Sequence, residues 1–399
     1  MPPGHVHEAM QMAGNPLGIG DSRDGSGTSW MPDASPMQSL MHHRGAWMLM
    51  LHGNAFVQFM NAGSLRGDTQ FGSVNWIMGM AQRPAAGGQV QLRSMFSIEP
   101  ITVGRCGYPN LLQTGELCRG TPLHDRQHPH DVFMELGVDY RRGISDAVAL
   151  ELYGGPVGEP AIGPTAFPHR LSAMPNPVAP LSHHWLDASH ISFGVVTAGV
   201  YGKRWKTEAS VFNGREPDDE RYDFDLGALD SYSGRVWLMP TPGWAIQVSA
   251  AHLNEAESPA AGVRANVDRV TASATYHRLV NSGVWATTAA WGRNSEDDHA
   301  SSAFLIETAA DVTTMDSVFA RADITGKTAK DLVLPLEAHD AFTVGKLQIG
   351  YTRWLARGGG LKAGIGGSVG VSIVPGTLAP FYGGRVGRDF SVFLTVRPQ

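Results

Sequence analysis

The sequence predicts an all-β protein, a transmembrane antiparallel up-and-down β-barrel of about sixteen strands. Apolar and polar residues alternate along most of the chain, and the last strand shows it with Phe390, Val392, Leu394 and Val396 on one face. A side-chain period of two is that of a β-strand. The connections between predicted strands alternate between short and long. The chain has no run of about 18 apolar residues, which a membrane-spanning helix needs.

Composition narrows the class of protein further. Charged residues make up 17% of the 399 residues, whereas about a quarter is typical of soluble domains. The 48 glycines suit many turns and close strand packing. A formal net charge of -6 provides no basic surface for nucleic acid. Residues 1–14 have neither a basic n-region nor an apolar h-region, so we expect a signal peptide to be absent from this numbering.

The alternating pattern assigns a range to each strand. Residues 1–40 lack a clear period, and we expect them to form a polar, Met/His/Gly-rich extension in the barrel mouth or lumen, with the barrel over residues 41–399. The predicted strands cover residues 45–60, 70–82, 88–101, 131–142, 146–155, 190–201, 203–214, 231–239, 243–254, 266–278, 283–293, 301–309, 315–324, 342–354, 359–372 and 384–397.

Loop length gives the orientation of the barrel. Connections after even-numbered strands are short, as at 84–88, whereas those after odd-numbered strands are mostly long, as at 104–130, 158–189, 255–264 and 294–300. Bacterial outer-membrane barrels have short periplasmic turns and long extracellular loops. An even number of strands places both termini on the short-turn side. The pattern therefore predicts a bacterial outer-membrane location.

The two faces of the predicted strands differ in chemistry. A charge that faces lipid near the midplane costs about 2–4 kcal/mol, so the charge-free face is expected to meet lipid. Its apolar residues include Leu92, Phe96, Ile98, Met134, Leu136, Val138, Val148, Leu150, Leu152, Ile246, Val248, Leu347, Ile349 and Tyr351. The charged residues expected to line the lumen and meet solutes are Arg93, Glu99, Glu135, Asp139, Glu151, Lys206, Glu208, Arg235, Arg269 and Lys362.

The lumen charges are expected to separate into two sides and to create a transverse field that orients polar solutes. Arg93, Arg235, Arg269 and Lys362 would form the positive side, and the carboxylates the negative side. Aromatic residues near the strand ends match an interfacial girdle. They are Trp47, Tyr140, Trp205, Trp244, Tyr276, Trp285 and Trp354.

Three stretches give the chain a resemblance to a known class. They are HDRQHPHDVFMELGVDY, AFPHRLSAMPNPVAPLSHHWLDASHISFGVVTAGVYG and EASVFNGREPDDERYDFD. The chain resembles proteobacterial outer-membrane β-barrel proteins of the porin-like kind over about residues 28–399. The resemblance implies the fold and the location, and it implies no catalytic or binding residues. The C-terminal Arg397-Pro398-Gln399, in place of a terminal aromatic, departs from the usual pattern.

Histidine and methionine supply the donor types of a candidate metal site, with copper or zinc as the candidate cofactor. Imidazoles with carboxylates suit zinc, copper or nickel, and thioethers with imidazoles favour Cu(I). The favoured interpretation is that the histidines fix the loops through hydrogen bonds to backbone and that the methionines fill gaps, with metal binding as the alternative. The candidate ligands are His124, His128, His130, His183, His184 and His190 in two long loops, and Met48, Met50 and His52 on a predicted lumen face.

Other residue groups suggest further chemistry. Cys106 and Cys118 are expected to form a disulfide, with two free thiols as the alternative. Ser182-His183-His184 and Ser189-His190, with Asp187, supply the residue types of a hydrolase, but the chain lacks G-x-S-x-G and H-E-x-x-H motifs. The acidic run 215–225 is interpreted as a solvated outer loop that could collect cations.

Together these features predict a non-enzymatic channel for small hydrophilic solutes or ions. The main alternative is an outer-membrane protein that binds or handles copper, and a lesser one is a hydrolase embedded in the barrel. The expected partners are outer-membrane lipid and small solutes. The sequence leaves the oligomeric state open.

Overall fold

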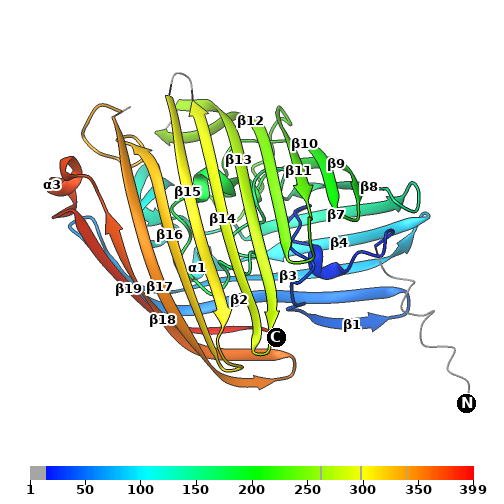
Figure 1. The fold of residues 1–399 in the computed structure, drawn as a ribbon. Helices are drawn as coiled ribbons and strands as arrows, with labels where there is room; N and C mark the ends of the chain where they lie inside the picture. The colour runs from blue at the N-terminus through cyan, green and yellow to red at the C-terminus, as the bar shows by residue number, and fades with distance from the viewer. Residues whose placement is uncertain (1–14, 261–262, 297–298, 339) are drawn as a thin grey trace, which may run out of the picture.

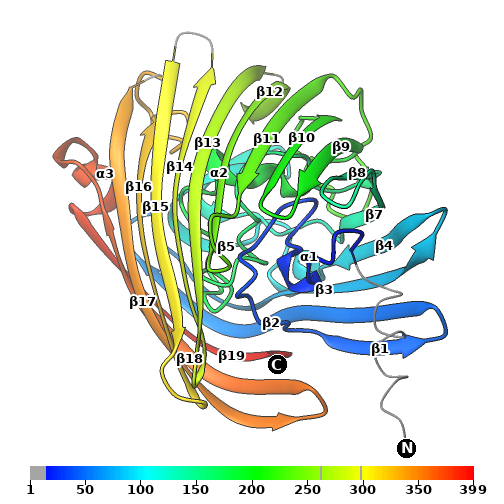
Figure 2. The same cartoon turned by 45° about the vertical axis from the view of Figure 1, so that its right-hand side comes forward.

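The computed structural model is a closed antiparallel barrel of sixteen strands (Figures 1 and 2). It describes residues 15–260, 263–296, 299–338 and 340–399. Each strand pairs with its neighbours in chain order, and the last strand closes onto the first, from Val396 opposite Ala55 to Arg388 opposite Gly63. The predicted fold class is therefore confirmed. The barrel strands are β2 (Trp47–Gly63), β3 (Thr69–Ala85), β4 (Gly88–Phe96), β7 (Phe133–Gly143), β8 (Ala149–Val157), β9 (Val195–Gly202), β10 (Trp205–Phe212), β11 (Ser231–Leu238), β12 (Trp244–Ala260), β13 (Val263–Val280), β14 (Gly283–Glu296), β15 (His299–Asp311), β16 (Asp316–Thr328), β17 (Ala341–Gly358), β18 (Leu361–Ile373) and β19 (Val386–Pro398).

The barrel is apolar outside and polar inside, the reverse of a soluble protein. On β17, Ile349 is 60% exposed, whereas its neighbour Gln348 is 7% exposed. The same contrast separates Leu92 from Arg93 on β4, at 44% and 3% exposure. A continuous exposed apolar band of this kind marks a surface that meets something other than water. Because strand side chains alternate between the faces, the polar residues are directed into the lumen.

Two residues predicted to face the membrane lie inside: Met134, assigned to the outward face, and Trp354, assigned to the aromatic girdle. Met134 is 1% exposed because β7 bulges there, with Phe133 opposite Phe96 and Glu135 opposite Met95. A bulge inserts one residue and changes the face that its side chain meets. Trp354 is also buried, and its indole donates to Ser317 Oγ over 2.8 Å.

Other aromatic residues do form a belt near the short turns. The rings of Trp244 and Tyr276 are 4.9 Å apart, and those of Tyr276 and Trp285 are 6.2 Å apart. Trp205, 39% exposed, begins β10 next to another short turn. Amphipathic rings at this level suit the interface between lipid and water.

Strand β4 ends earlier than the sequence predicts. It stops at Phe96, and Glu99–Thr102 form the short helix α1 instead of continuing the strand. Pro100 has no backbone N–H for a strand ladder and fits the first turn of a helix. Glu99 therefore belongs to the helix, although it is fully buried, as expected for a residue inside the barrel.

The two rims differ in the way that the sequence predicts, with two corrections. Residues 86–87 join β3 to β4, whereas 97–132 and 158–194 form long connections on the opposite rim. The predicted long loops 255–264 and 294–300 are wrong, because both hairpins continue as paired strand, to Ala260 opposite Val263 and to Glu296 opposite His299.

Smaller elements surround or enter the barrel. Strand β1 (Leu40–Arg44) pairs with the start of β2, beyond the point where β19 ends. Strands β5 (Tyr108–Cys118) and β6 (Thr121–Gln127) form a hairpin within the first long connection. None of the helices in the described ranges is long and apolar enough to cross a membrane. The remaining helices are η1 (Asp21–Arg23), α2 (His183–Leu186), η2 (Ala188–His190), η3 (Gly376–Leu378) and α3 (Ala379–Tyr382).

Candidate functional site

Residues 15–39, here named the N-terminal plug, lie inside the barrel (Figure 2). Cationic side chains of the wall hold its backbone. Arg93 donates to Gly27 O over 2.6 Å, and Lys206 Nζ donates to Thr28 O. The plug packs against turns of the short rim, as shown by the hydrogen bond of 2.9 Å from Ala34 N to Pro242 O. The plug therefore fills the end of the lumen next to the short turns.

Trp30 anchors the plug. Its side chain is 4% exposed and lies between two cations, the Arg23 guanidinium and the Lys206 ammonium, each 4.8 Å from its ring. Cation–π contacts in such a desolvated place are worth about 2 kcal/mol or more. Arg23 also pairs with Asp33 over 2.7 Å within the plug.

Ion pairs follow one another along one part of the wall, from β4 through β7 and β8 to β10 and β11, and are here named the ion-pair ladder. Arg93 lies 3.0 Å from Glu135, and Arg235 lies 2.8 Å from Glu208. Lys206 of β10 bridges Glu208 of the same strand at 3.4 Å and Glu151 of β8 at 2.9 Å. At these distances the oppositely charged side chains are in direct contact.

The expected separation into a positive and a negative side of the lumen is therefore wrong. Cations and carboxylates alternate along the ladder instead. The physical reason is burial: Arg93, Lys206, Glu208 and Arg235 are each 4% exposed or less, and an unpaired buried charge costs several kcal/mol. Alternating signs leave little transverse field for orienting solutes.

The other predicted lumen residues are also buried. Asp139 pairs with Arg141 over 2.7 Å, and Arg141 continues to Asp24 of the plug over 2.8 Å. Arg269 donates to Asn294 Oδ1 over 2.9 Å on a different part of the wall. Lys362 is 4.3 Å from the centre of the Trp354 ring.

Residues 158–194, here named the inward loop, fill the middle of the lumen. Arg170 is 1% exposed and pairs with Glu307 of β15 over 2.6 Å and with Asp187 of the loop over 2.9 Å. Ser182 Oγ donates to Asp323 of β16 over 2.7 Å. The loop is thus attached to the wall opposite the ladder and lies inside the lumen.

Five of the loop histidines proposed as metal ligands pack together, and His130, His183 and His190 also contact the ring of Phe167. The ring centres of His130 and His190 are 5.3 Å apart, as are those of His183 and His190. The members of this histidine cluster are His128, His130, His183, His184 and His190. His124 lies apart from it, 40% exposed at its side chain and 2.8 Å from Asp125.

The cluster is fixed by hydrogen bonds. Nδ1 of His183 lies 2.8 Å from Asp187 Oδ1, and Nδ1 of His190 lies 2.8 Å from Asp187 O. Nδ1 of His130 lies 2.9 Å from Glu99 Oε2. These contacts agree with the interpretation that the histidines hold the loops in place, which the sequence allowed as well as metal binding. Metal binding by these histidines stays a prediction.

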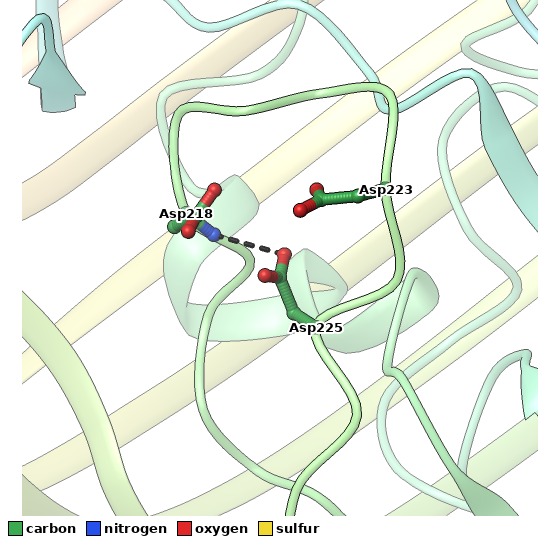
Figure 3. A group of neighbouring side chains, drawn as sticks. All are labelled: Asp218, Asp223 and Asp225. Atoms are coloured by element: carbon green, nitrogen blue, oxygen red, sulfur yellow. Dashed lines mark hydrogen bonds between the residues drawn. The ribbon is translucent and has the colours of Figure 1, made fainter.

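In the described ranges, the single group of three or more His, Cys, Asp or Glu side chains with ligand atoms within 4.8 Å of one another is Asp218, Asp223 and Asp225 (Figure 3). These residues belong to the acidic run, and the Asp218 N–H donates to Asp225 Oδ2 over 3.1 Å. Asp218 and Asp223 are exposed and Asp225 is half-buried. The group fits the solvated outer loop expected from the sequence.

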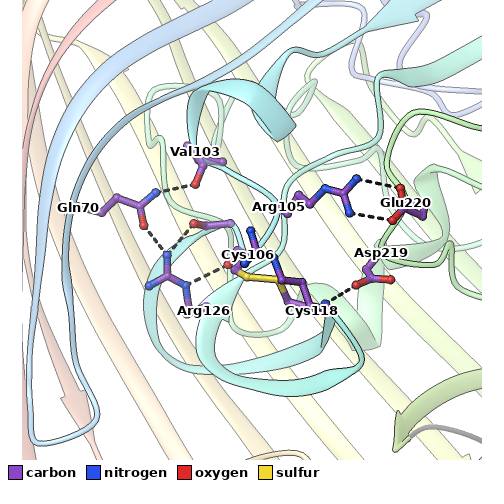
Figure 4. Close-up of a disulfide and its surroundings, with 10 residues drawn as sticks. Gln70, Val103, Arg105, Cys106, Cys118, Arg126, Asp219 and Glu220 are labelled. Carbon is purple, nitrogen blue, oxygen red and sulfur yellow. Dashed lines mark hydrogen bonds and ion pairs between the residues drawn. A yellow bond between two sulfur atoms is a disulfide. The ribbon is translucent and has the colours of Figure 1, made fainter.

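A disulfide joins Cys106 to Cys118, as predicted (Figure 4). It fastens the segment before β5 to the end of that strand. Arg126 of β6 donates to Cys106 O over 3.0 Å and pairs with Asp68 of the β2–β3 connection over 2.7 Å. The cross-linked hairpin is thus anchored at the long-loop rim.

The hydroxyls of Ser182 and Ser189 bond to residues other than histidine. Ser182 donates to Asp323, and the Ser189 hydroxyl accepts a hydrogen bond of 3.2 Å from Arg269. The Asp187 carboxylate orients His183, and it also pairs with Arg170, which attaches the inward loop to the wall. These contacts give the residues a role in holding the inward loop.

The histidine cluster predicts a dependence of loop packing on pH. Burial lowers the pKa of the His183 and His190 imidazoles. The stabilisation of the loop by their neutral forms is therefore fully present above about pH 6.5. It is lost as the pH falls toward the pKa values that these imidazoles have in the folded protein. We expect amide hydrogen exchange across residues 158–194, corrected for intrinsic rates, to be faster at pH 5 than at pH 7.5.

The other charged groups that face the cluster limit this effect. Burial opposes charge on His130, but the adjacent Glu99 outweighs it and raises the pKa of His130, so its contribution is fully present below about pH 6.5 and is lost as the pH rises through the raised folded-state pKa. Asp131 and Arg221 also act on His130. Because two imidazoles oppose one, the net effect is loosening in acid. A pH dependence unchanged by replacing His183 and His190 with glutamine would contradict the prediction.

The fold agrees with that of solved outer-membrane proteins. The anion-selective porin from Comamonas acidovorans is 9% identical, with a TM-score of 0.53 over 88% of this chain and 99% of that chain. OmpF of Salmonella typhi, in complex with daunomycin, is 8% identical, with a TM-score of 0.52 over 90% of this chain and 100% of that chain. The chain has the fold of outer-membrane porins.

The channel DcaP of Acinetobacter baumannii has the same fold, at 8% identity and a TM-score of 0.51 over 89% of this chain and 98% of that chain. No family model and no curated protein matches the sequence. Identities this low establish the architecture alone. The plug, the inward loop and the ion-pair ladder must therefore be interpreted from their own contacts.

Proposed function

We propose that the protein lies in a bacterial outer membrane and is a channel for small hydrophilic solutes or ions, held closed by its N-terminal plug and inward loop. The observation that carries this proposal is the nature of the contacts in the lumen. Arg141–Asp24 ties the plug to the wall, and Arg170–Glu307 ties the loop to it. Charged and polar groups can exchange such partners for water. The plug and the inward loop can therefore move while the hydrogen bonds between the barrel strands stay intact.

The outer surface supports the membrane location. Exposed aliphatic side chains cover the strands, and the aromatic belt of Trp244, Tyr276 and Trp285 marks one border. A sixteen-stranded barrel encloses enough space for an aqueous channel once its lumen is cleared. Both properties are those of a channel wall.

A cavity of about 380 Å³ near the long-loop rim offers a first contact for a solute. His184 and Trp185 of the inward loop line it, together with Glu296 of β14 and Lys327 of β16. The Lys327 ammonium lies 5.1 Å from the centre of the Trp185 ring. A polar solute that enters here meets the inward loop directly, which suits a solute that displaces the loop.

Planar-bilayer recording of the purified full chain tests the proposal. We expect brief, stepwise openings at neutral pH and more frequent ones at pH 5, where the inward loop loosens. Swelling of liposomes that contain the protein, in sugars of increasing size, then measures the size limit. Heat-denatured protein is the control. The proposal fails if correctly folded protein passes neither ions nor sugars at either pH, with or without its N-terminal plug.

A further inference from the structure

A second cavity lies where the wall, the inward loop and the N-terminal plug meet. It has a volume of about 60 Å³, enough for more than one water molecule. Methionines from all three parts of the chain line it: Met50 and Met80 from the wall, Met174 from the inward loop, and Met31 and Met37 from the plug. We call it the methionine pocket.

Strand register explains why the wall contributes two thioethers. Met50 of β2 and Met80 of β3 are direct cross-strand partners, and both also line the pocket. His52 follows Met50 by two residues and so points to the same face. The wall therefore presents two thioethers and an imidazole at one level of the lumen.

Two histidines complete the lining. The ring of His52 lies 5.4 Å from that of His169 of the inward loop. His169 Nε2 is 3.4 Å from the sulfur of Met95, a further thioether behind the pocket. His52 Nε2 is buried and has no hydrogen-bond partner among the described residues. A buried imidazole nitrogen without a partner is costly, so it points to a ligand.

Gap filling by methionine does not explain this pocket. Flexible thioether side chains serve as filler by closing irregular spaces. Here they surround an open space and share it with two imidazoles. Met48, proposed from the sequence as a ligand with Met50 and His52, is outside the lining and contacts Gln82 instead, at 3.8 Å.

The donor set selects the kind of ion. Thioethers are soft and, with imidazole, favour Cu(I), whereas calcium, magnesium and manganese prefer carboxylates and carbonyls. Asp21 and Asp24 also border the pocket, but Asp24 pairs with Arg141 over 2.8 Å and Asp21 accepts from Gln82 over 3.3 Å. They supply negative charge nearby without being free ligands. A single positive charge suits such a setting better than a divalent ion.

We propose that the methionine pocket binds one soft monovalent cation, copper(I), through thioethers of the wall, loop and plug and the His52 imidazole. Because its ligands come from three separate parts of the chain, a bound ion would cross-link them inside the lumen. Binding then raises the thermal stability of the folded protein, by linkage. Neither statement requires the protein to conduct.

The test uses the full chain in detergent. Cu(I) binding is measured without oxygen by competition with a coloured Cu(I) chelator, and Ag(I) serves as a redox-inert probe. We expect one ion per chain and a rise in unfolding temperature with either metal. Replacing Met50 and Met80 with leucine, or His52 with alanine, should weaken binding by about tenfold or more. X-ray absorption of the copper-loaded protein should show sulfur and nitrogen ligands.

Matched variants separate the pocket from incidental binding. Met60→Leu changes a buried methionine farther along β2, and His252→Ala removes an imidazole that pairs with Asp268. Neither should alter the affinity. Leucine keeps most of the volume of methionine, and circular dichroism confirms that each variant is folded. Equal binding by all variants, no binding against the chelator, or a preference for Zn(II) would overturn the proposal.

Discussion

A variant that lacks residues 15–39 is expected to conduct ions with a mean current about tenfold or more above that of the full chain. The deletion removes one of the two segments that fill the lumen, and a sixteen-stranded barrel is wide enough to hold water in the space that it leaves. The plug meets the wall through Gly27 and Thr28, which accept hydrogen bonds from Arg93 and Lys206. Its removal leaves these cations facing water. Single-channel recording in a planar bilayer measures the change.

The barrel should survive this deletion. Arg93 keeps Glu135 at 3.0 Å, and Lys206 keeps Glu151 at 2.9 Å, so no charge of the ladder loses its last partner. Migration on a gel with and without heating verifies the fold. Trp30→Phe is the control, because it keeps an aromatic anchor, and it should stay closed. A folded deletion variant with unchanged current would show that the inward loop closes the lumen alone.

The barrel could be predicted from the sequence because the pattern that marks each strand is local. An alternation of apolar and polar residues fixes a strand and its two faces without reference to any distant residue. The predicted lumen residues on strands, such as Arg93 and Glu208, are therefore all buried. The prediction was wrong at two places. At Met134 a bulge shifts the alternation of faces along β7, and at Glu99 a helix begins where the strand was expected to continue.

The candidate site was harder to predict because its partners meet only in the folded chain. Glu307, Arg321 and Asp323 lie on strands whose alternation could have indicated the lumen. Asp24 and Arg170 lie in segments without period, and nothing in the sequence pairs them with Arg141 or Glu307. The charge pattern gave the residue types of the ladder but not their alternation in space, which follows from cross-strand neighbours.

The methionine pocket shows the same division. Met50 and His52 could be placed on one face from their spacing, and they do share the pocket. Met174 and His169 come from the inward loop, and Met31 and Met37 from the plug, so only the tertiary structure brings them together.

Arg170→Ala is expected to detach the inward loop from the wall. Arg170 pairs with Glu307 over 2.6 Å and Asp187 over 2.9 Å, and its guanidinium also donates to Thr165 O over 2.8 Å. Removing one partner of a buried ion pair typically costs about 3–5 kcal/mol, because the remaining charge stays buried. Glu307 retains Arg321 at 3.0 Å, so we expect the loop to open before the barrel unfolds.

Hydrogen exchange distinguishes these two outcomes. Amides of residues 158–194 should exchange much faster in Arg170→Ala, whereas those of β14 to β17 should change little. Arg170→Lys should restore only part of the protection, because an ammonium lacks the planar fork that reaches both carboxylates. Arg215→Ala, which breaks the more exposed pairs with Asp230 and Glu255, is the control and should leave the inward loop protected. Equal protection of the loop in Arg170→Ala and the unaltered chain would mean that Ser182 and the histidine cluster hold it without the ion pairs.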